Sequence, residues 1–244
     1  MTITRLFVLC AALLSQSAWA ANLGVTPVAV YMSNAANRAT VSIVNYGDEP
    51  VTMQVEGIEW TRVNGVDKDG ETSDIMVNPA VFTVEPGDNQ IIRVGMRKPA
   101  NPSTEGTYRL VLREVPVVAA PSDTSGGTNV RVLVAMRIPI YVAPTKVVRD
   151  ENWKVNTDGK GNIVVKLNNN GNVHYKVGGI KMRPNQDKES APLATSSEGG
   201  VIFPGETRAF NMRSAQPLAN KSITLEVFTD IGPQYVTTEI ARGD

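Results

Sequence analysis

Apolar and polar residues alternate along many short stretches of this 244-residue chain, and almost no stretch shows a helical period. The longest alternation covers 129–141 and is typical of a β-strand with one apolar face. On the other face, Pro139 has no N–H to give to a ladder, so we expect a sheet edge or the end of pairing there. An apolar edge needs a cover, either from this chain or from a second one. We call its apolar positions the apolar stripe: Val130, Val132, Val134, Met136, Ile138 and Ile140.

The same alternation recurs on both sides of this stretch, and turns rich in Gly, Pro and Asn separate the alternating segments. In the first part of the chain it predicts strands at 24–32, 38–45, 51–60, 77–84, 90–96, 106–114 and 129–141. In the second part it predicts strands at 153–156, 162–168, 176–183, 201–203, 206–212, 223–229 and 234–240.

This spacing predicts an all-β protein made of two tandem immunoglobulin-like β-sandwiches. The residues Val142-Ala143-Pro144-Thr145 interrupt the strand pattern, and Pro144 is the expected hinge. We therefore expect an N-terminal domain at 21–143 and a C-terminal domain at 144–244.

The first 20 residues have the pattern of a cleaved secretory signal peptide. Arg5 supplies the positive start, Leu6–Leu14 the apolar run, and Ala18-Trp19-Ala20 the small-x-small cleavage site. The run is too short to span a bilayer. The only cysteine, Cys10, lies in this segment, so the exported chain has no disulfide and each domain must be held by its core.

Charge and composition argue against nucleic-acid binding and against catalysis. The chain has 24 basic and 24 acidic residues, and a balance near zero does not suit a nucleic-acid partner. One histidine and no cysteine after cleavage exclude a Cys–His pair, and no serine sits in a nucleophile elbow. Asp67–Glu71 lacks the ladder of a calcium loop and is predicted to be a hairpin turn. His174 is predicted to be a surface or packing residue, so we expect no enzyme activity, no cofactor and no metal.

Two segments of the first domain carry motifs that resemble a known family. Asn78–Gly87, followed by Ile92-Arg93-Val94, is similar to a Pro-x-x-Phe-x-(Leu/Val)-x-Pro-Gly turn and the strand after it. Glu105–Pro116 is similar to a strand that ends in Ile-Pro-Pro, and Phe228–Gly232 to an Asn-Asp-aromatic-Gly element. With the signal peptide and second sandwich, the whole exported chain resembles the periplasmic chaperones that assemble surface pili by the chaperone–usher route.

The resemblance implies a periplasmic chaperone that lends the last strand of its first domain to a pilus subunit whose own fold lacks one. It would prevent aggregation of the subunit and deliver it to an outer-membrane usher. Matching by position places the lent residues at Val130, Val132, Val134 and Met136. Whether the free protein caps this strand by forming a dimer stays open.

Two departures from the family pattern concern the subunit's terminal carboxylate. Members usually bind it with an Arg on the first strand and a Lys on the last, but here those positions are Val28 and Pro139. The chain therefore resembles the divergent, archaic branch, and the carboxylate needs another cation. Arginine forks bind carboxylates well, so Arg109, Arg113 and Arg137 are the candidates.

A third departure concerns the interdomain residues. The family's Arg before the hinge proline is Ala143 here, whereas Glu105 and Asp230 match the acids with which that Arg pairs. The resemblance therefore implies a junction at Pro144 without the family's buried ion-pair network.

Other interpretations remain open from sequence alone. The apolar stripe would also fit an internal strand of a closed sandwich. A pilus subunit or adhesin would be one incomplete sandwich, and a secreted carbohydrate-binding module would expose an aromatic platform, whereas aromatic residues make up only 6% of this chain.

Overall fold

The computed structural model describes residues 22–97, 102–116, 132–185, 190–218 and 221–242, so the predicted signal peptide lies outside it. All regular elements in these residues are strands, and none of the described segments forms a helix that could cross a membrane. The chain forms two compact units and passes from the first to the second after Tyr141. Ser33–Ala35 and the described part of 100–106 group with the second unit.

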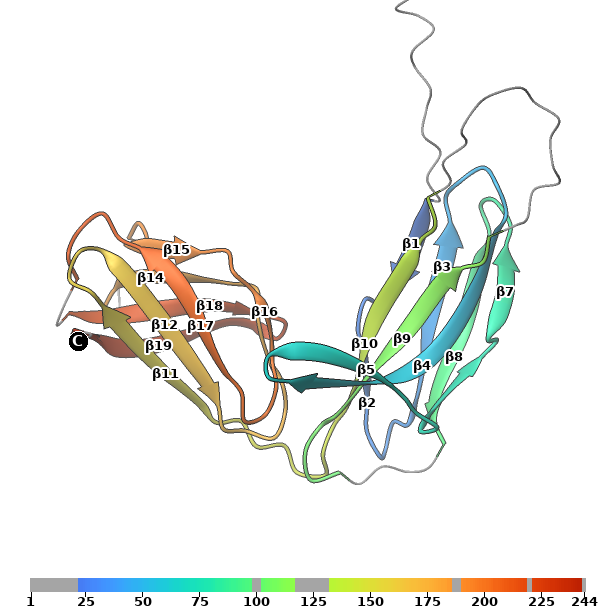
Figure 1. Cartoon of the computed structure of the whole chain (residues 1–244), viewed down its shortest axis with the longest axis horizontal. Coiled ribbons are helices and arrows are strands. Elements are labelled where there is room, and N and C mark those ends of the chain that lie inside the picture. Colours follow the sequence, from blue (N-terminus) through green and yellow to red (C-terminus); the bar gives the residue numbers. More distant parts are fainter. Residues whose placement is uncertain (1–21, 98–101, 117–131, 186–189, 219–220, 243–244) are drawn as a thin grey trace, which may run out of the picture. The chain divides into compact units, whose positions relative to one another are not determined.

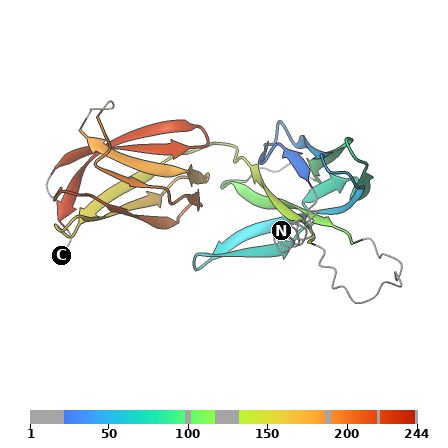
Figure 2. The same cartoon turned by 90° about the horizontal axis from the view of Figure 1, so that it is seen from above.

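The first domain is a sandwich of two sheets (Figures 1 and 2). One sheet has the order β1-β3-β8-β6, formed by Leu23–Thr26, Arg38–Asn45, Asn89–Met96 and Ile75–Asn78. The other has the order β2-β10-β9-β4-β5, formed by Val30–Met32, Ala135–Val142, Gly106–Glu114, Val51–Val63 and Val66–Glu71, and β7 (Val81–Val84) pairs with β4. Alternate residues of both sheets form the buried core, including Val41, Ile43, Ile92, Met53, Leu110, Leu112 and Ile140.

The second domain contains a seven-stranded sheet and a two-stranded sheet. The larger has the order β15-β14-β18-β19-β11-β12-β17, formed by Ala194–Ser196, Gly179–Pro184, Ser222–Thr229, Gly232–Arg242, Glu151–Thr157, Asn162–Asn169 and Thr207–Arg213. The smaller pairs β13 (Tyr175–Val177) with β16 (Gly200–Ile202). Phe210, Leu225 and Met182 are fully buried in its core. Two all-β sandwiches confirm the predicted fold class.

One buried asparagine joins the two sheets of the first domain. Asn45, at the end of β3, donates from Nδ2 to the carbonyl oxygens of Glu49 (2.7 Å) and Val84 (3.0 Å). Its Oδ1 accepts from the N–H of Gly47 at 2.9 Å, and its backbone oxygen accepts from the N–H of Gly87 at 2.9 Å. Since Val84 ends β7 in the opposite sheet, this side chain connects the two layers.

Asn169 makes the same connection in the second domain. At the end of β12, its Nδ2 donates to the carbonyl oxygens of Val173 (2.9 Å) and Ile202 (3.1 Å). Its Oδ1 accepts from Gly171 N–H at 3.0 Å, and its backbone oxygen accepts from Gly205 N–H at 2.7 Å. We call each of these arrangements an asparagine corner.

The two asparagine corners share a sequence pattern that strand alternation does not reveal. Each is an Asn-x-Gly at a strand end, paired with a later Pro-Gly turn at Pro86-Gly87 or Pro204-Gly205. Both turn glycines have a φ of 80°, a conformation that side chains rarely adopt. The repeat shows that both sandwiches are closed in the same way.

Several of the predicted strands and turns differ from the structure in their extent. The range 24–32 forms two strands, β1 and β2, which pair in different sheets with Pro27 between them. The range 77–84 likewise divides into β6 and β7. Residues 66–71, predicted as a turn, form strand β5, because their alternating acids find basic partners across the hairpin.

Replacing Asn169 by Ala should strongly destabilise the second domain. The change leaves two buried carbonyl oxygens without their donor, and each unsatisfied buried group costs about 1–3 kcal/mol. We therefore expect the free energy of unfolding to fall by at least about 2 kcal/mol, measured by urea denaturation. Asn168→Ala is the matched control, because the side-chain hydrogen bonds of Asn168 are exposed. Equal losses in the two variants would contradict the role of the corner.

Candidate functional site

Strand β10 begins later than the alternation predicts. It spans Ala135–Val142, whereas residues 132–134 lie outside any strand, and Val130 is not among the described residues. Ile138 and Ile140 are buried in the core of the domain, but Val132 is 63% exposed. Val134 and Met136, the remaining predicted donor positions, are half-buried. The last two residues of the apolar stripe thus complete this chain's own core, whereas Val132 does not.

Val134 is the point at which the stripe leaves strand β9. Its carbonyl oxygen accepts from the N–H of Glu114 at 2.9 Å, and its N–H donates to Oε2 of the buried Glu114 side chain at 3.1 Å. Beyond Glu114, the N–H of Val115 turns to Thr52, and Pro116 has no N–H to offer. Strand pairing with β9 therefore ends at this residue.

The prediction that β10 is an edge strand holds for only part of its length. In the sheet, β10 lies between β9 and β2. However, β2 has only three residues, and its Tyr31 stacks on Tyr141 near the end of β10, with ring centroids 5.5 Å apart. Among the described strands, none covers the first half of β10 on this side. The exposed half of the stripe therefore carries an open edge.

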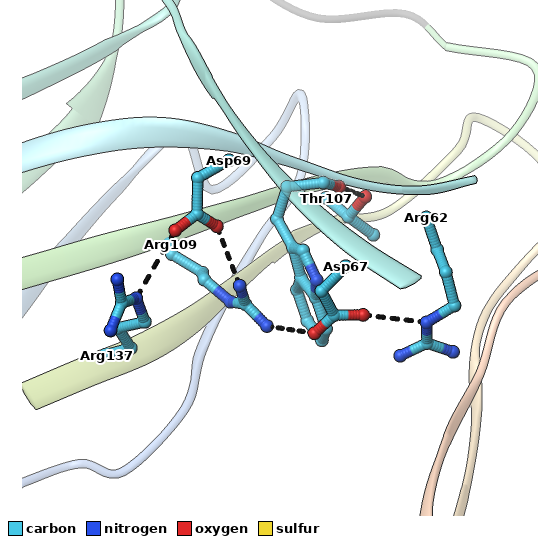
Figure 3. A network of polar contacts seen from close by, with 7 residues as sticks. Arg62, Asp67, Asp69, Thr107, Arg109 and Arg137 are labelled. Carbon is cyan, nitrogen blue, oxygen red and sulfur yellow. Dashed lines mark hydrogen bonds and ion pairs between the residues drawn. The ribbon is translucent and has the colours of Figure 1, made fainter. Parts of the chain in front are cut away.

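In the same sheet, on the side of β10 away from this edge, the β4–β5 hairpin brings two carboxylates between three guanidinium groups (Figure 3). Arg109 donates from Nη2 to Asp67 at 2.5 Å and from Nη1 to Asp69 at 2.7 Å. Arg62 donates from Nε to Asp67 at 2.7 Å, and Arg137 on β10 approaches Asp69 with Nε at 3.3 Å. We call these five residues the Arg–Asp cluster.

Arg109 is the most firmly held member of the Arg–Asp cluster. Its guanidinium carbon lies 4.1 Å from the centroid of the buried Trp60 ring, in a cation–π contact. Thr107 donates its hydroxyl to the carbonyl oxygen of Trp60 at 2.6 Å and supports this arrangement (Figure 3). Since both terminal nitrogens of Arg109 already bind carboxylates, it has little capacity for another.

The arginines also control the ionisation of Asp67. Burial alone would raise the pKa of its carboxyl, but the hydrogen bonds and positive charges of Arg62 and Arg109 outweigh burial and lower that pKa. Asp67 is therefore charged at neutral pH, and two of the three guanidinium groups are committed to it.

The three predicted carboxylate anchors differ in how far they are engaged. Arg113 pairs with Glu56, and Arg109 binds both acids of the hairpin. Arg137 has a side chain that is 51% exposed, and within the described part of the chain its ion pairing is limited to the 3.3 Å contact with Asp69. The family's two usual clamp positions are uncharged here; Val28 is 76% exposed.

Glu105 and Asp230, whose usual arginine partner is replaced by Ala143, both lie beside His174. His174 Nδ1 is 2.7 Å from Oε2 of Glu105, and Nε2 is 3.5 Å from Oδ2 of Asp230. The backbone N–H of His174 donates to the same Glu105 oxygen at 2.9 Å. With His174 7% and Glu105 5% exposed, this is a buried polar cluster rather than a surface histidine.

Asn172 ties the surrounding segments of the second unit to this histidine. Its Nδ2 donates to the carbonyl oxygens of Ser103 (2.9 Å) and Lys146 (2.8 Å), and its carbonyl oxygen accepts from the N–H of Glu105 at 2.8 Å. Pro144, the predicted hinge, is buried. The one sequence feature that could have indicated a buried His174 is the Asn-x-Gly motif at Asn169, because His174 follows that asparagine corner closely in sequence.

No group of three or more potential metal ligands occurs in the described residues. Residues 22–148, more than half of the chain, match the family described as pili and flagellar-assembly chaperone, PapD N-terminal domain. Comparison with curated protein sequences gives no match.

Several solved structures share the two-domain fold. A chain of the CsuC–CsuE chaperone–tip adhesion subunit pre-assembly complex, from archaic chaperone-usher Csu pili of Acinetobacter baumannii, has 16% identity and a TM-score of 0.61. The alignment covers 92% of this chain and all of that one. A chain of the Salmonella enterica SafA pilin–SafB chaperone complex has 14% identity and a TM-score of 0.62, with 91% and 99% covered. The E. coli chaperone DraB has 17% identity and a TM-score of 0.60, with 90% and 97% covered. At these identities the likeness establishes the fold.

Replacing His174 by Ala should destabilise the second domain, because buried Glu105 loses one of its two donors from this residue. A hydrogen bond to a charged group contributes about 1.5–3 kcal/mol, and we expect a loss of that size in denaturant unfolding. His174→Gln retains a side-chain donor and should lose less. If Gln and Ala lose the same amount, the packing of the ring and not its hydrogen bond is what stabilises the domain.

Proposed function

The match over residues 22–148 shows that this protein belongs to the family of pili and flagellar-assembly chaperones, and we propose that it captures pilus subunits. In this proposal the segment that binds the subunit is the first part of the apolar stripe, up to Met136. The observation that carries the proposal is the division of the stripe at Val134. Val132, just before this residue, is exposed, Val134 and Met136 are half-buried, and Ile138 and Ile140 are buried in the core.

Strand addition explains how an exposed stripe can bind an incomplete sandwich. The free N–H and C=O groups of the open edge pair with an open edge of the subunit, and alternate side chains enter its exposed groove. Burying each Val-sized side chain contributes about 1.5–3 kcal/mol. Val130, Val132, Val134 and Met136 are the residues that we assign to this role.

The chaperone can lend this segment without unfolding itself. Ile138 and Ile140 stay in its own core, and the backbone of Val134 remains bonded to Glu114. Because the hydrogen bonds of Val134 hold one end of the donated segment, the segment has already lost part of its conformational freedom, which lowers the entropic cost of binding.

The compartment and the later steps follow from family membership and from the predicted signal peptide. We assign the protein to the periplasm, where it keeps subunits from aggregating and delivers them to an outer-membrane usher. No catalytic step, cofactor or metal is part of this function. A secreted carbohydrate-binding module is not favoured, because the matching family assembles pili.

Among the three candidate anchors for the subunit's terminal carboxylate, we favour Arg137. A strand that adds to the open edge of β10 can extend only as far as β2, which occupies the same edge near Tyr141. The end of that strand therefore lies close to Arg137, whose guanidinium favours a carboxylate there. Arg109 and Arg113 stand on β9 and already bind acids of this chain.

Changing Val132 to Asp should abolish subunit capture while leaving the free chaperone folded. The variant must place an unpaired charge in an apolar groove and loses a buried Val, which together should weaken binding more than about tenfold. Subunit yield on co-purification and a thermal melt of the free protein are the two measurements. Ala135→Asp is the control, since in β10 this side chain points away from the stripe. If Val132→Asp lowers the melting temperature as a core substitution does, the stripe is internal and the assignment fails.

Changing Arg137 to Ala should weaken capture of a subunit that has a free C-terminal carboxylate. Losing one charge-assisted hydrogen bond costs about 1.5–3 kcal/mol, which corresponds to about tenfold to a hundredfold in affinity. Arg113→Ala serves as the matched control, because its partner is Glu56. Equal effects in the two variants, or none in either, would argue against Arg137 as the anchor.

A further inference from the structure

The carboxylate of Asp69 is shared unequally between two arginines. Oδ1 accepts from Nη1 of Arg109 at 2.7 Å, which is a strong charge-assisted hydrogen bond. Oδ2 lies 3.3 Å from Nε of Arg137, beyond the usual range for such a bond. Figure 3 shows Asp69 between the two guanidinium groups. Asp69 can therefore give up Arg137 and still keep its stronger partner.

The charges of the Arg–Asp cluster leave room for one more carboxylate. Its three guanidinium groups face two carboxylates, so one positive charge remains uncompensated within the cluster. Asp67 is held by Arg62 and Arg109, and neither of its contacts involves Arg137. The uncompensated charge is therefore located at Arg137, the most exposed of the three arginines.

Strand β5 fixes the position of Asp69. Asp69 lies opposite Trp60 and Asp67 opposite Arg62 in the β4–β5 register, so both acids point to one face of the hairpin. That face also carries Arg109, whose guanidinium packs on the Trp60 ring. Because the backbone ladder and Arg109 hold Asp69 in place, it cannot move far from an anion bound at Arg137.

From this geometry we propose that Asp69 is a resident competitor for the carboxylate site on Arg137 and thereby weakens subunit capture. The proposal rests on the function proposed above and adds a residue that regulates it. The subunit's terminal carboxylate replaces Asp69 on the guanidinium of Arg137, and Asp69 remains on Arg109. The nearby negative charge then repels the bound carboxylate, so the complex is weaker than Arg137 alone would make it.

Removing the charge of Asp69 should therefore tighten subunit binding. Asp69→Asn keeps the shape of the side chain and removes its charge. Opposite or like unit charges about 4 Å apart near a protein surface interact appreciably even in water, so we expect binding about threefold to tenfold tighter at low salt. The gain should shrink as salt rises, because these groups are partly exposed.

The probe is the pilus subunit that co-purifies with the wild-type chaperone, prepared with its own C-terminus and with a two-residue Gly-Gly extension that moves the carboxylate. Differently tagged wild-type and variant chaperones compete for a limiting amount of this subunit, and the ratio carried by each is measured. Asp69→Asn should win the competition for the native subunit and show no advantage for the extended one.

Asp67→Asn is the matched control, because it removes a carboxylate from Arg109 and Arg62 without touching Arg137. It should gain less than Asp69→Asn. In an Arg137→Ala background, the gain from Asp69→Asn should disappear, which a double-mutant cycle measures directly. If Asp69→Asn melts below the wild type, Asp69→Thr supplies a second neutral variant that suits a strand.

The outcomes separate this inference from the proposed function. If wild-type chaperone carries no subunit, the proposed function itself fails, and this inference fails with it. If the wild type carries the subunit but both neutral variants bind it no more tightly, only the role of Asp69 is overturned. A gain that persists with the extended subunit, or without Arg137, also overturns it.

Discussion

Two buried asparagines hold together a protein that has no disulfide in its described domains. Asn45 and Asn169 each bind one carbonyl oxygen four residues further along the chain and one from a distant strand of the opposite sheet. Because buried polar groups are costly when unpaired, breaking any hydrogen bond of an asparagine corner destabilises the whole arrangement. The two layers are thereby joined through the chain's own strand ends, and closure of the first sandwich does not depend on the start of the apolar stripe.

That independence is what allows the stripe to serve two purposes. Its last residues, Ile138 and Ile140, lie in the core, and its first half ends at the Val134–Glu114 contact. A soluble chain normally suppresses an exposed apolar edge, because such an edge recruits other chains. Here the open edge is short and is fixed at the Val134–Glu114 contact, which limits the backbone on which another chain could add.

Strand alternation predicted the fold class and the apolar stripe, because burial on one face imposes a period of two. It could not predict where β10 begins, since that depends on Glu114 and Pro116, which belong to another strand. It missed β5, whose alternating positions are acids and are stabilised by charge rather than by burial. The sequence left open whether His174 is a surface or a packing residue, because one histidine has no period and its partners Glu105 and Asp230 are far away in sequence. The asparagine corners are visible as a repeat only once both hydrogen-bond patterns are known.

The short strand β2 has a consequence for which clients fit. It closes one end of the open edge near Tyr141, and the exposed Val132 lies at the other end, just before the Val134–Glu114 contact. From Val132 to Arg137 this edge is about six residues, or roughly 20 Å at strand spacing. A docking strand that is too long would collide with β2, and one that is too short would leave its end group away from the arginine. Under the proposed strand addition, the first domain therefore favours subunits whose docking strand matches this length.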